Sequence, residues 1–408
     1  MEAVFRHIEG GVCAPQGFRA AGAACGIKSG SDSKDIALIV SDVMCDAAAV
    51  YTTNKVKGAP LDVTKKNIED GRAQAIICNS GNANTCAPGG RKLALQTCEI
   101  AAEALCIGKN DIIVCSTGVI GQKLDIEPFK KGVPVLADML SYRGSDDAAE
   151  AIMTTDTIPK TIAVEFELGG RVCRIGGIAK GSGMINPNMA TMLSFITTDT
   201  DISSDMLEKA LKAAADVSFN QICVDGDTST NDMVAVLASG EAGNSRITEE
   251  GADFDMFADA LLEVTVYLAK KLARDGEGAS KLIECNVKGA PDRTAAQKIS
   301  KTVISSNLLK AAMFGEDANW GRVLCAIGYA DAEFDINKVE VDLKSEKGIV
   351  TVCKNGAGVE FSEEKAAEVL SSDEIYILIN LNQGPESATA WGCDLTYDYV
   401  KINGDYRT

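Results

Sequence analysis

The chain has 408 residues, 46% of them hydrophobic, and a formal net charge of −18 at pH 7. Such a negative charge, without a dense run of lysines or arginines, repels phosphate backbones and excludes a nucleic-acid partner. The chain has a single histidine, His7, so we expect no Ser-His-Asp triad, no Cys-His pair and no H-E-x-x-H metal site.

The 14 cysteines are scattered, with no C-x-x-C pair and no neighbouring histidines that would complete a zinc site. We expect them to be reduced and mostly buried, as in a cytosolic protein. The N-terminus lacks the basic start and apolar core of a signal peptide, and no run reaches the roughly 20 apolar residues of a membrane span. These features predict a soluble, cytoplasmic protein of two or three domains, with no metal and no cofactor.

Strand-like and helix-like segments alternate from the N-terminus onward. Short apolar runs bounded by polar or small residues, typical of buried strands, lie at 36–40, 75–78 and 112–115. The segment 91–105 is rich in Ala, Leu and Glu and predicts a helix between the last two.

The same alternation continues in the C-terminal half. A strand-like run at 192–198 precedes a helix that Ser203 or Ser204 caps, and a longer helix is predicted over 254–272 with a glycine cap at Gly276. The remaining predicted elements are strands at 338–343, 348–352 and 375–381 and a helix at 362–370. The chain is therefore α/β, and without repeats or a Pro-rich linker any domain boundary lies in ordinary loops.

The segment 180–191 is the most informative part of the chain. Small and turn-forming residues deliver Thr191 to the start of a strand, a position where a chain can cleave itself before a hydroxyl residue. The freed α-amine, with a reference pKa of about 7.7–8.0, then lies within reach of its own Oγ and can act as its base. An N-terminal threonine therefore suits a chain with almost no histidine.

Four polar, glycine-punctuated loops follow predicted strand or helix ends, where functional residues often lie; they are 79–84, 116–121, 224–232 and 274–278. Alone, the first predicts a solvated turn. The second places the Thr117 hydroxyl beside the Gly118 N–H, which suits an oxyanion or an ordinary turn. None of the glycine-rich loops matches a Walker A or dinucleotide-binding pattern.

The third loop is rich in carboxylates, but the twelfth position counted from Asp225 is Val236 rather than the Glu of a calcium loop. This favours a hydrogen-bonded structural loop over a metal site. The fourth loop carries Glu277 just after a helix end. That carboxylate is either solvated or buried beside an amine substrate.

Together with Thr191, these loops resemble the glutamate N-acetyltransferase family, also called ornithine acetyltransferase, of arginine biosynthesis. The segments that carry the resemblance are 10–18, 79–84, 116–121, 180–184, 190–192, 224–232, 274–278, 314–322 and 393–403. They run almost end to end. Gln221 and Cys223 stand where Arg and Thr are expected, and 404–405 also differ, but none of these positions is assigned to catalysis.

The resemblance implies cleavage between Ala190 and Thr191, which gives an α chain, 1–190, and an interwoven β chain, 191–408. Thr191 would take the acetyl group of N-acetylornithine and pass it to glutamate by a ping-pong mechanism, with Thr117 and Gly118 as the oxyanion hole. Substrate contacts that the resemblance implies are Thr154, Lys180, Thr191, Glu277, Asn403 and Thr408. The charge of Lys180 suits a carboxylate, and that of Glu277 suits the ornithine ammonium group.

The implied fold is an αββα-type sandwich related to the self-cleaving aminopeptidases, with additional smaller α/β domains, usually in a particle of two α and two β chains. Two other functions stay open on the residues alone: an N-terminal-nucleophile aminopeptidase or amidohydrolase, and a non-enzymatic small-molecule binder. Acetyl-CoA is a second donor in some members of the family, and no residue in this sequence decides that point.

Overall fold

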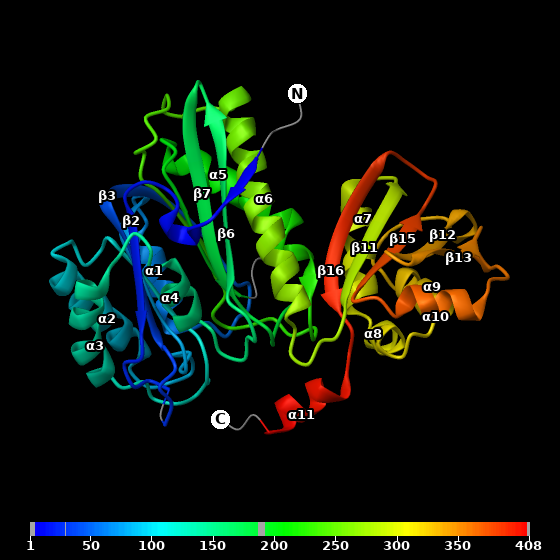
Figure 1. Ribbon diagram of the computed structural model, residues 1–408, viewed down its shortest axis with the longest axis horizontal. Helices are drawn as coiled ribbons and strands as arrows, with labels where there is room; N and C mark the ends of the chain where they lie inside the picture. The colour runs from blue at the N-terminus through cyan, green and yellow to red at the C-terminus, as the bar shows by residue number, and fades with distance from the viewer. Residues whose placement is uncertain (1–4, 29, 187–191, 406–408) are drawn as a thin grey trace.

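The computed structural model describes residues 5–28, 30–186 and 192–405, which form two domains, each built around its own β-sheet (Figure 1). The first sheet has the strand order β1-β6-β7-β8-β10-β3-β4-β5, with β2 paired to β3. Its strands are β1 (Arg6–Ile8), β2 (Phe18–Ala23), β3 (Ile36–Tyr51), β4 (Arg72–Asn79), β5 (Ile112–Ser116), β6 (Lys160–Leu168), β7 (Arg171–Lys180), β8 (Leu193–Thr198) and β10 (Met233–Ala238).

The long strand β3 folds this sheet into two layers. Its first half pairs with β2 and β4 and its second half with β10, with a register shift between Val40 and Cys45. Helices flank both layers: α1 (Ala59–Asn67), α2 (Gly90–Leu105), α3 (Glu127–Met139), α4 (Ser145–Ala151), α5 (Ser204–Val217) and α6 (Ala252–Arg274).

Alternating side chains of each strand enter different cores, because successive residues of a strand point to opposite faces. One face of the β2–β5 half packs on α2 and α3 through Leu38 and Ile77, and its other face packs through Ile39 and Ile76 against the β7–β10 half. The far face of the β7–β10 half packs on α5 and α6, with Val236 in that core. The order helices, sheet, sheet, helices confirms the expected αββα-type sandwich (Figure 1).

The second domain is smaller, and most of its buried side chains form one core, whereas Leu282, Trp391 and Cys393 join the core that contains α6. Its sheet has the order β14-β13-β12-β15-β11-β16-β9. Its elements are β9 (Ile222–Cys223), β11 (Leu282–Ala290), α7 (Arg293–Ser305), α8 (Asn307–Phe314), α9 (Trp320–Gly328), β12 (Glu340–Ser345), β13 (Gly348–Lys354), β14 (Ala357–Gly358), α10 (Glu363–Leu370), β15 (Glu374–Asn380), β16 (Glu386–Cys393) and α11 (Tyr397–Asp405). Buried residues of α7–α10, such as Val303 and Val369, pack on Ile283 and Ile377 of the sheet.

The predicted elements are confirmed in place and type, but the reason for Gly276 was wrong. The helix over 254–272 is α6, which ends at Arg274, and Gly276 is not in the left-handed conformation of a glycine cap. A Cβ there would lie 2.8 Å from the Cys393 sulfur and 3.0 Å from Val224. Close packing, rather than backbone conformation, therefore requires the glycine.

All cysteines are free thiols and most are buried, as their scattered spacing predicted. Among the described residues, no helix combines the length and the apolar character that a membrane span requires.

The proposed cleavage point, between residues 190 and 191, falls between two neighbouring strands of the first sheet, β7 and β8. These strands are antiparallel neighbours, and their last pair is Lys180 with Leu193. The strands β8 and β10 therefore lie between β7 and β3, which come before residue 190 in the chain. The parts of the chain before and after residue 190 share one sheet.

Candidate active site

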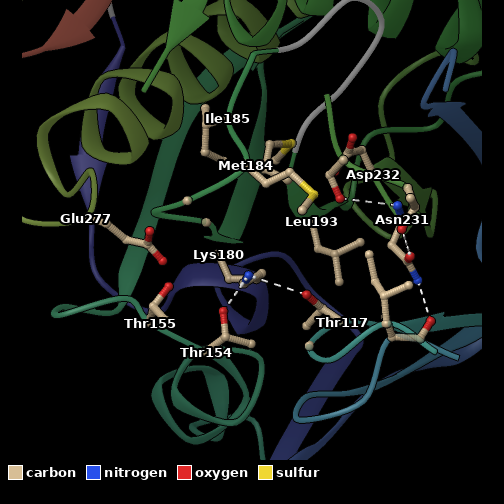
Figure 2. A pocket seen from close by; sticks show the side chains of 18 of the residues that line it. Thr117, Thr154, Thr155, Lys180, Met184, Ile185, Leu193, Asn231, Asp232 and Glu277 are labelled. Atoms are coloured by element: carbon tan, nitrogen blue, oxygen red, sulfur yellow. Dashed lines mark hydrogen bonds between the residues drawn. The ribbon is translucent and has the colours of Figure 1, made fainter. Parts of the chain in front are cut away.

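A cavity of about 170 Å³ opens at the end of β7 and β8 (Figure 2). Among the residues that line it are six predicted site residues from separate parts of the sequence: Thr117, Gly118, Thr154, Lys180, Glu277 and Asn403. The other predicted site residues, Ala190, Thr191 and Thr408, lie outside the described residues. Met192, which follows Thr191 in the chain, also lines the cavity.

Gly118 stands where a side chain cannot fit. Its φ is +125°, and a Cβ would lie 2.4 Å from the Gly81 carbonyl carbon and 2.6 Å from the Asn82 nitrogen. Glycine alone tolerates both the conformation and the close approach. The Gly118 N–H makes no hydrogen bond with the described residues, so it remains available to a ligand oxygen.

The loop 79–84 supports this turn and is not the solvated turn that its sequence alone predicted. Asn79 is 1% exposed; its side-chain oxygen accepts a hydrogen bond from the Ser116 hydroxyl at 2.6 Å, and its backbone carbonyl accepts one from the Thr117 N–H at 2.9 Å. The first loop therefore holds the second in place, because buried polar groups need such partners.

Lys180 reaches across the cavity from the end of β7. Its ammonium group donates to the Thr154 hydroxyl at 2.8 Å and to the Thr117 hydroxyl at 3.4 Å (Figure 2). Because the Thr117 oxygen accepts from Lys180, its own proton is free to be donated elsewhere. Thr117 and Gly118 thus offer two adjacent donors, the arrangement that stabilises an oxyanion.

Glu277 also lines the cavity, and Figure 2 shows it beside Thr155, with Lys180 between it and Thr117. The Asn403 side chain in α11 donates to the Glu277 carboxylate at 2.7 Å. The Glu277 backbone N–H donates to the Ser182 carbonyl at 2.9 Å. Of the two alternatives for Glu277, the structure favours the carboxylate in a site. A cavity that carries one lysine and one glutamate suits a small ligand with charges of both signs.

The loop 224–232 is a hydrogen-bonded structural loop, as its sequence favoured. The Asp225 carboxylate accepts from the N–H groups of Met184 and Ile185, at 2.5 and 2.9 Å. Asn231 donates to the carbonyls of Ala83 and Ser116, at 2.6 and 2.9 Å, and so connects this loop to the oxyanion turn. Among the described residues, no group of three or more His, Cys, Asp or Glu could hold a metal ion.

Asp232 is a cavity residue that the sequence did not single out. It is 2% exposed, and its Oδ2 has no hydrogen-bond partner among the described residues. Burial raises the pKa of this carboxyl well above its ordinary value, although the hydroxyls of Ser229 and Thr52 and the charge of Lys180 act in the opposite direction. The available signal was an acidic residue directly before the apolar run 233–238.

The family model and the similar sequences both identify the same family. The model of the ArgJ family matches residues 19–408. The chain is 54% identical to the arginine biosynthesis bifunctional protein ArgJ of Symbiobacterium thermophilum over 403 residues, 98% of this chain and 99% of the relative.

Solved structures are similar over about half of the chain. The crystal structure of arginine biosynthesis bifunctional protein ArgJ from Bacillus halodurans is 46% identical, with a TM-score of 0.50, and the match covers 53% of this chain and all of that one. The ornithine acetyltransferase of Mycobacterium tuberculosis, solved in complex with ornithine, is 38% identical with a TM-score of 0.42, over 46% of this chain and all of that one.

Proposed function

The chain belongs to the ArgJ family, and we propose that, as an acetyltransferase of arginine biosynthesis, it moves the acetyl group of N2-acetylornithine to glutamate. The observation that supports this most is the cavity, which gathers two oxyanion donors, a lysine and a glutamate beside Met192. Residue 191 is the covalent neighbour of Met192. Because Met192 lines the cavity, we infer that the residue before it, Thr191, supplies the hydroxyl nucleophile.

The nucleophile requires a free N-terminus at Thr191. We propose that the chain is cleaved between Ala190 and Thr191, into an α chain (1–190) and a β chain (191–408). Shared membership of one sheet keeps the two parts together after such a cut. The solved ArgJ chain that matches over its full length spans 53% of this chain, the share that 191–408 makes up.

In the first half-reaction, Thr191 Oγ attacks the acetyl carbonyl carbon of N2-acetylornithine while the Thr191 α-amine takes the hydroxyl proton. The carbonyl oxygen becomes an oxyanion that accepts from the Thr117 hydroxyl and the Gly118 N–H. The C–N bond then breaks, the ornithine nitrogen takes the proton back from the Thr191 amine, and the acetyl group remains as an ester on Thr191.

In the second half-reaction, the neutral α-amine of glutamate attacks the carbonyl carbon of this ester and gives its proton to the Thr191 α-amine. The C–O bond to Thr191 then breaks, and the Thr191 oxygen takes that proton from the Thr191 α-amine. The products are N-acetylglutamate and the free enzyme, so acetyl and protons balance over the cycle. The reaction needs no cofactor.

Binding follows the charges of the cavity. Lys180 and the Thr154 hydroxyl bind the substrate carboxylate, and Glu277, which Asn403 orients, binds the side-chain ammonium of ornithine. Thr408 contributes a further contact in this proposal. We also propose that the protein is cytoplasmic and assembles as two α and two β chains. Acetyl-CoA is proposed as a second acetyl donor for glutamate.

Mass spectrometry and denaturing electrophoresis test the cleavage, and an assay of acetyl transfer from N2-acetylornithine to glutamate tests the reaction. Thr191→Ala should abolish both, whereas Thr191→Ser should retain part of each because it keeps the hydroxyl. An intact chain with full activity would disprove the N-terminal nucleophile.

The reaction products distinguish the proposed acetyltransferase from the alternative function, an aminopeptidase or amidohydrolase. An aminopeptidase or amidohydrolase would release free acetate or N-terminal residues of peptides rather than N-acetylglutamate. Replacing N2-acetylornithine by acetyl-CoA in the same assay determines whether acetyl-CoA is a donor.

A further inference from the structure

Three charged side chains are buried together beneath the cavity. The Lys160 ammonium group lies between two carboxylates, 2.7 Å from Asp156 and 2.6 Å from Asp275. The side chains of Lys160 and Asp156 are fully buried, and that of Asp275 is 5% exposed. Buried charges of this kind are costly unless each is paired and hydrogen-bonded.

Asp156 holds the wall that carries Lys180. One of its oxygens accepts from the Gly181 N–H at 2.6 Å and the other from the Thr154 N–H at 3.0 Å. Gly181 follows Lys180 directly, and the Thr154 hydroxyl accepts from the Lys180 ammonium group. A single carboxylate therefore fixes the backbone of both residues that we assign to the substrate carboxylate.

Asp275 lies next to the part of the wall that carries Glu277. It follows the last residue of α6, accepts from the Thr157 N–H at 3.1 Å and from the Thr157 hydroxyl, and stands two residues before Glu277. Thr155, between the two aspartate-bound segments, contacts the Ser182 hydroxyl at 2.6 Å. Ser182 in turn accepts from the Glu277 N–H.

The charges of this group support its geometry. Burial alone would raise the pKa of Asp156, but Lys180 and Lys160 lower it to about 2, so the carboxylate is ionised at neutral pH. Both lysines thus depend on the same negative charge, one by direct contact and one through the cavity wall.

We propose that the cluster Asp156–Lys160–Asp275 fixes the separation between Lys180 and Glu277, and thereby sets the preference of the site for an acetyl donor with a side-chain ammonium group. The three are positioning residues, because none of them lines the cavity. The inference rests on the proposed function, since it uses the roles assigned there to Lys180 and Glu277.

The two half-reactions provide the test, because in ping-pong transfer each substrate has its own kcat/KM. Asp275→Asn weakens the contacts of Asp275 with Thr157 and Lys160 but leaves the backbone contacts of Asp156 in place, so kcat/KM for N2-acetylornithine should fall about tenfold while that for glutamate falls less. Asp156→Asn loosens the wall of Lys180 and Thr154, so both values should fall. Shorter donors without the ammonium group should lose no rate in Asp275→Asn.

Asp199→Asn is a matched control. Asp199 is a fully buried carboxylate that accepts two backbone N–H groups, from Gln16 and Arg174, but it follows the far end of β8. A similar selective loss in this variant would overturn the inference, because any buried carboxylate would then act alike. Thr157→Val, which removes one hydroxyl bond to Asp275, covers the case in which Asp275→Asn does not fold, and should give a smaller loss of the same selectivity.

Glu277→Gln separates this inference from the proposed function. If Glu277→Gln lowers kcat/KM for N2-acetylornithine while the folded Asp275→Asn and Thr157→Val variants do not, the cluster has no positioning role. If Glu277→Gln has no effect either, the role assigned to Glu277 is wrong and the inference falls with it.

Discussion

The two domains bury lysines for different purposes. In the first domain, Lys160 and Lys180 contact carboxylates or hydroxyls in and beneath a cavity. In the second, the buried Lys310 donates to the carbonyl of Cys393 at the end of β16, and the buried Lys281 donates to the carbonyl of Leu370 and pairs with Glu316. Lys180 therefore faces the cavity of the first domain, whereas Lys310 and Lys281 of the second domain satisfy buried backbone carbonyls outside it. The second domain supplies only Asn403 to the cavity lining among the described residues.

The largest expected effect tests whether the first domain carries the chemistry. Thr117→Ala removes one of the two proposed oxyanion donors and should lower kcat by about 10²–10³-fold, with a smaller effect on binding. Steady-state kinetics of acetyl transfer measures both. Thr117→Ser should retain most of the rate.

Thr389→Ala is the matched change in the second domain. The Thr389 hydroxyl donates to the Asn286 side chain at 2.8 Å, and neither residue lines the cavity. An equal loss of kcat in this variant would contradict the conclusion that the first domain carries the chemistry.

A smaller effect concerns the stability that buried charge gives to the first domain. The folded pKa of Asp156, about 2, lies below its ordinary value of 3.8. This ionised carboxylate therefore contributes stability above pH 3.8, on the order of 2 kcal/mol, which is lost as pH falls through about 2. The unfolding free energies of wild type and Asp156→Asn should converge between about pH 4 and pH 2 in urea titrations. A gap that stays constant over this range would show that the charge of Asp156 adds nothing.

The next effect measures what the second domain adds to the site. Asn403→Ala removes the hydrogen bond to Glu277, and kcat/KM for N2-acetylornithine should fall about tenfold, since a hydrogen bond to a charged group contributes about 1.5 kcal/mol or more. The exposed Asn337, which bonds Asp335 within the second domain, is a control whose change to Ala should have no effect. An unchanged value in Asn403→Ala would leave the second domain without a role in binding.

The smallest expected effect is none at all. His7 lies on β1, is about half-exposed and contacts Glu263 of α6, and it does not line the cavity. If the Thr191 α-amine is the base, kcat/KM rises with pH through one ionisation, and His7→Gln leaves that profile unchanged. Lys180 would lower the pKa of the amine and Glu277 would raise it, so Lys180→Met should move the profile to higher pH. Loss of the ionisation in His7→Gln would make His7 the base.

Local patterns predicted local structure well. The strands at 36–40, 75–78 and 112–115 and the long helix after residue 251 lie where their periodicity placed them, because burial of one face repeats with the period of the element. The glycine at 276 was predicted at the right place for the wrong reason, since its neighbour Cys393 is more than 100 residues away in the chain.

The sequence by itself predicted the parts of the proposed site: a threonine after a turn-rich segment, a hydroxyl beside Gly118, and charged residues in glycine-punctuated loops. Only the tertiary structure decided that Thr117, Lys180 and Glu277 surround one cavity, and that the loop 79–84 is buried support. It also brought Asp156 and Asp275 onto a single lysine. The physical reason is that side-chain period and turn preference depend on near neighbours in the chain, whereas the meeting of distant loops depends on strand order and on how β3 folds one sheet into two layers.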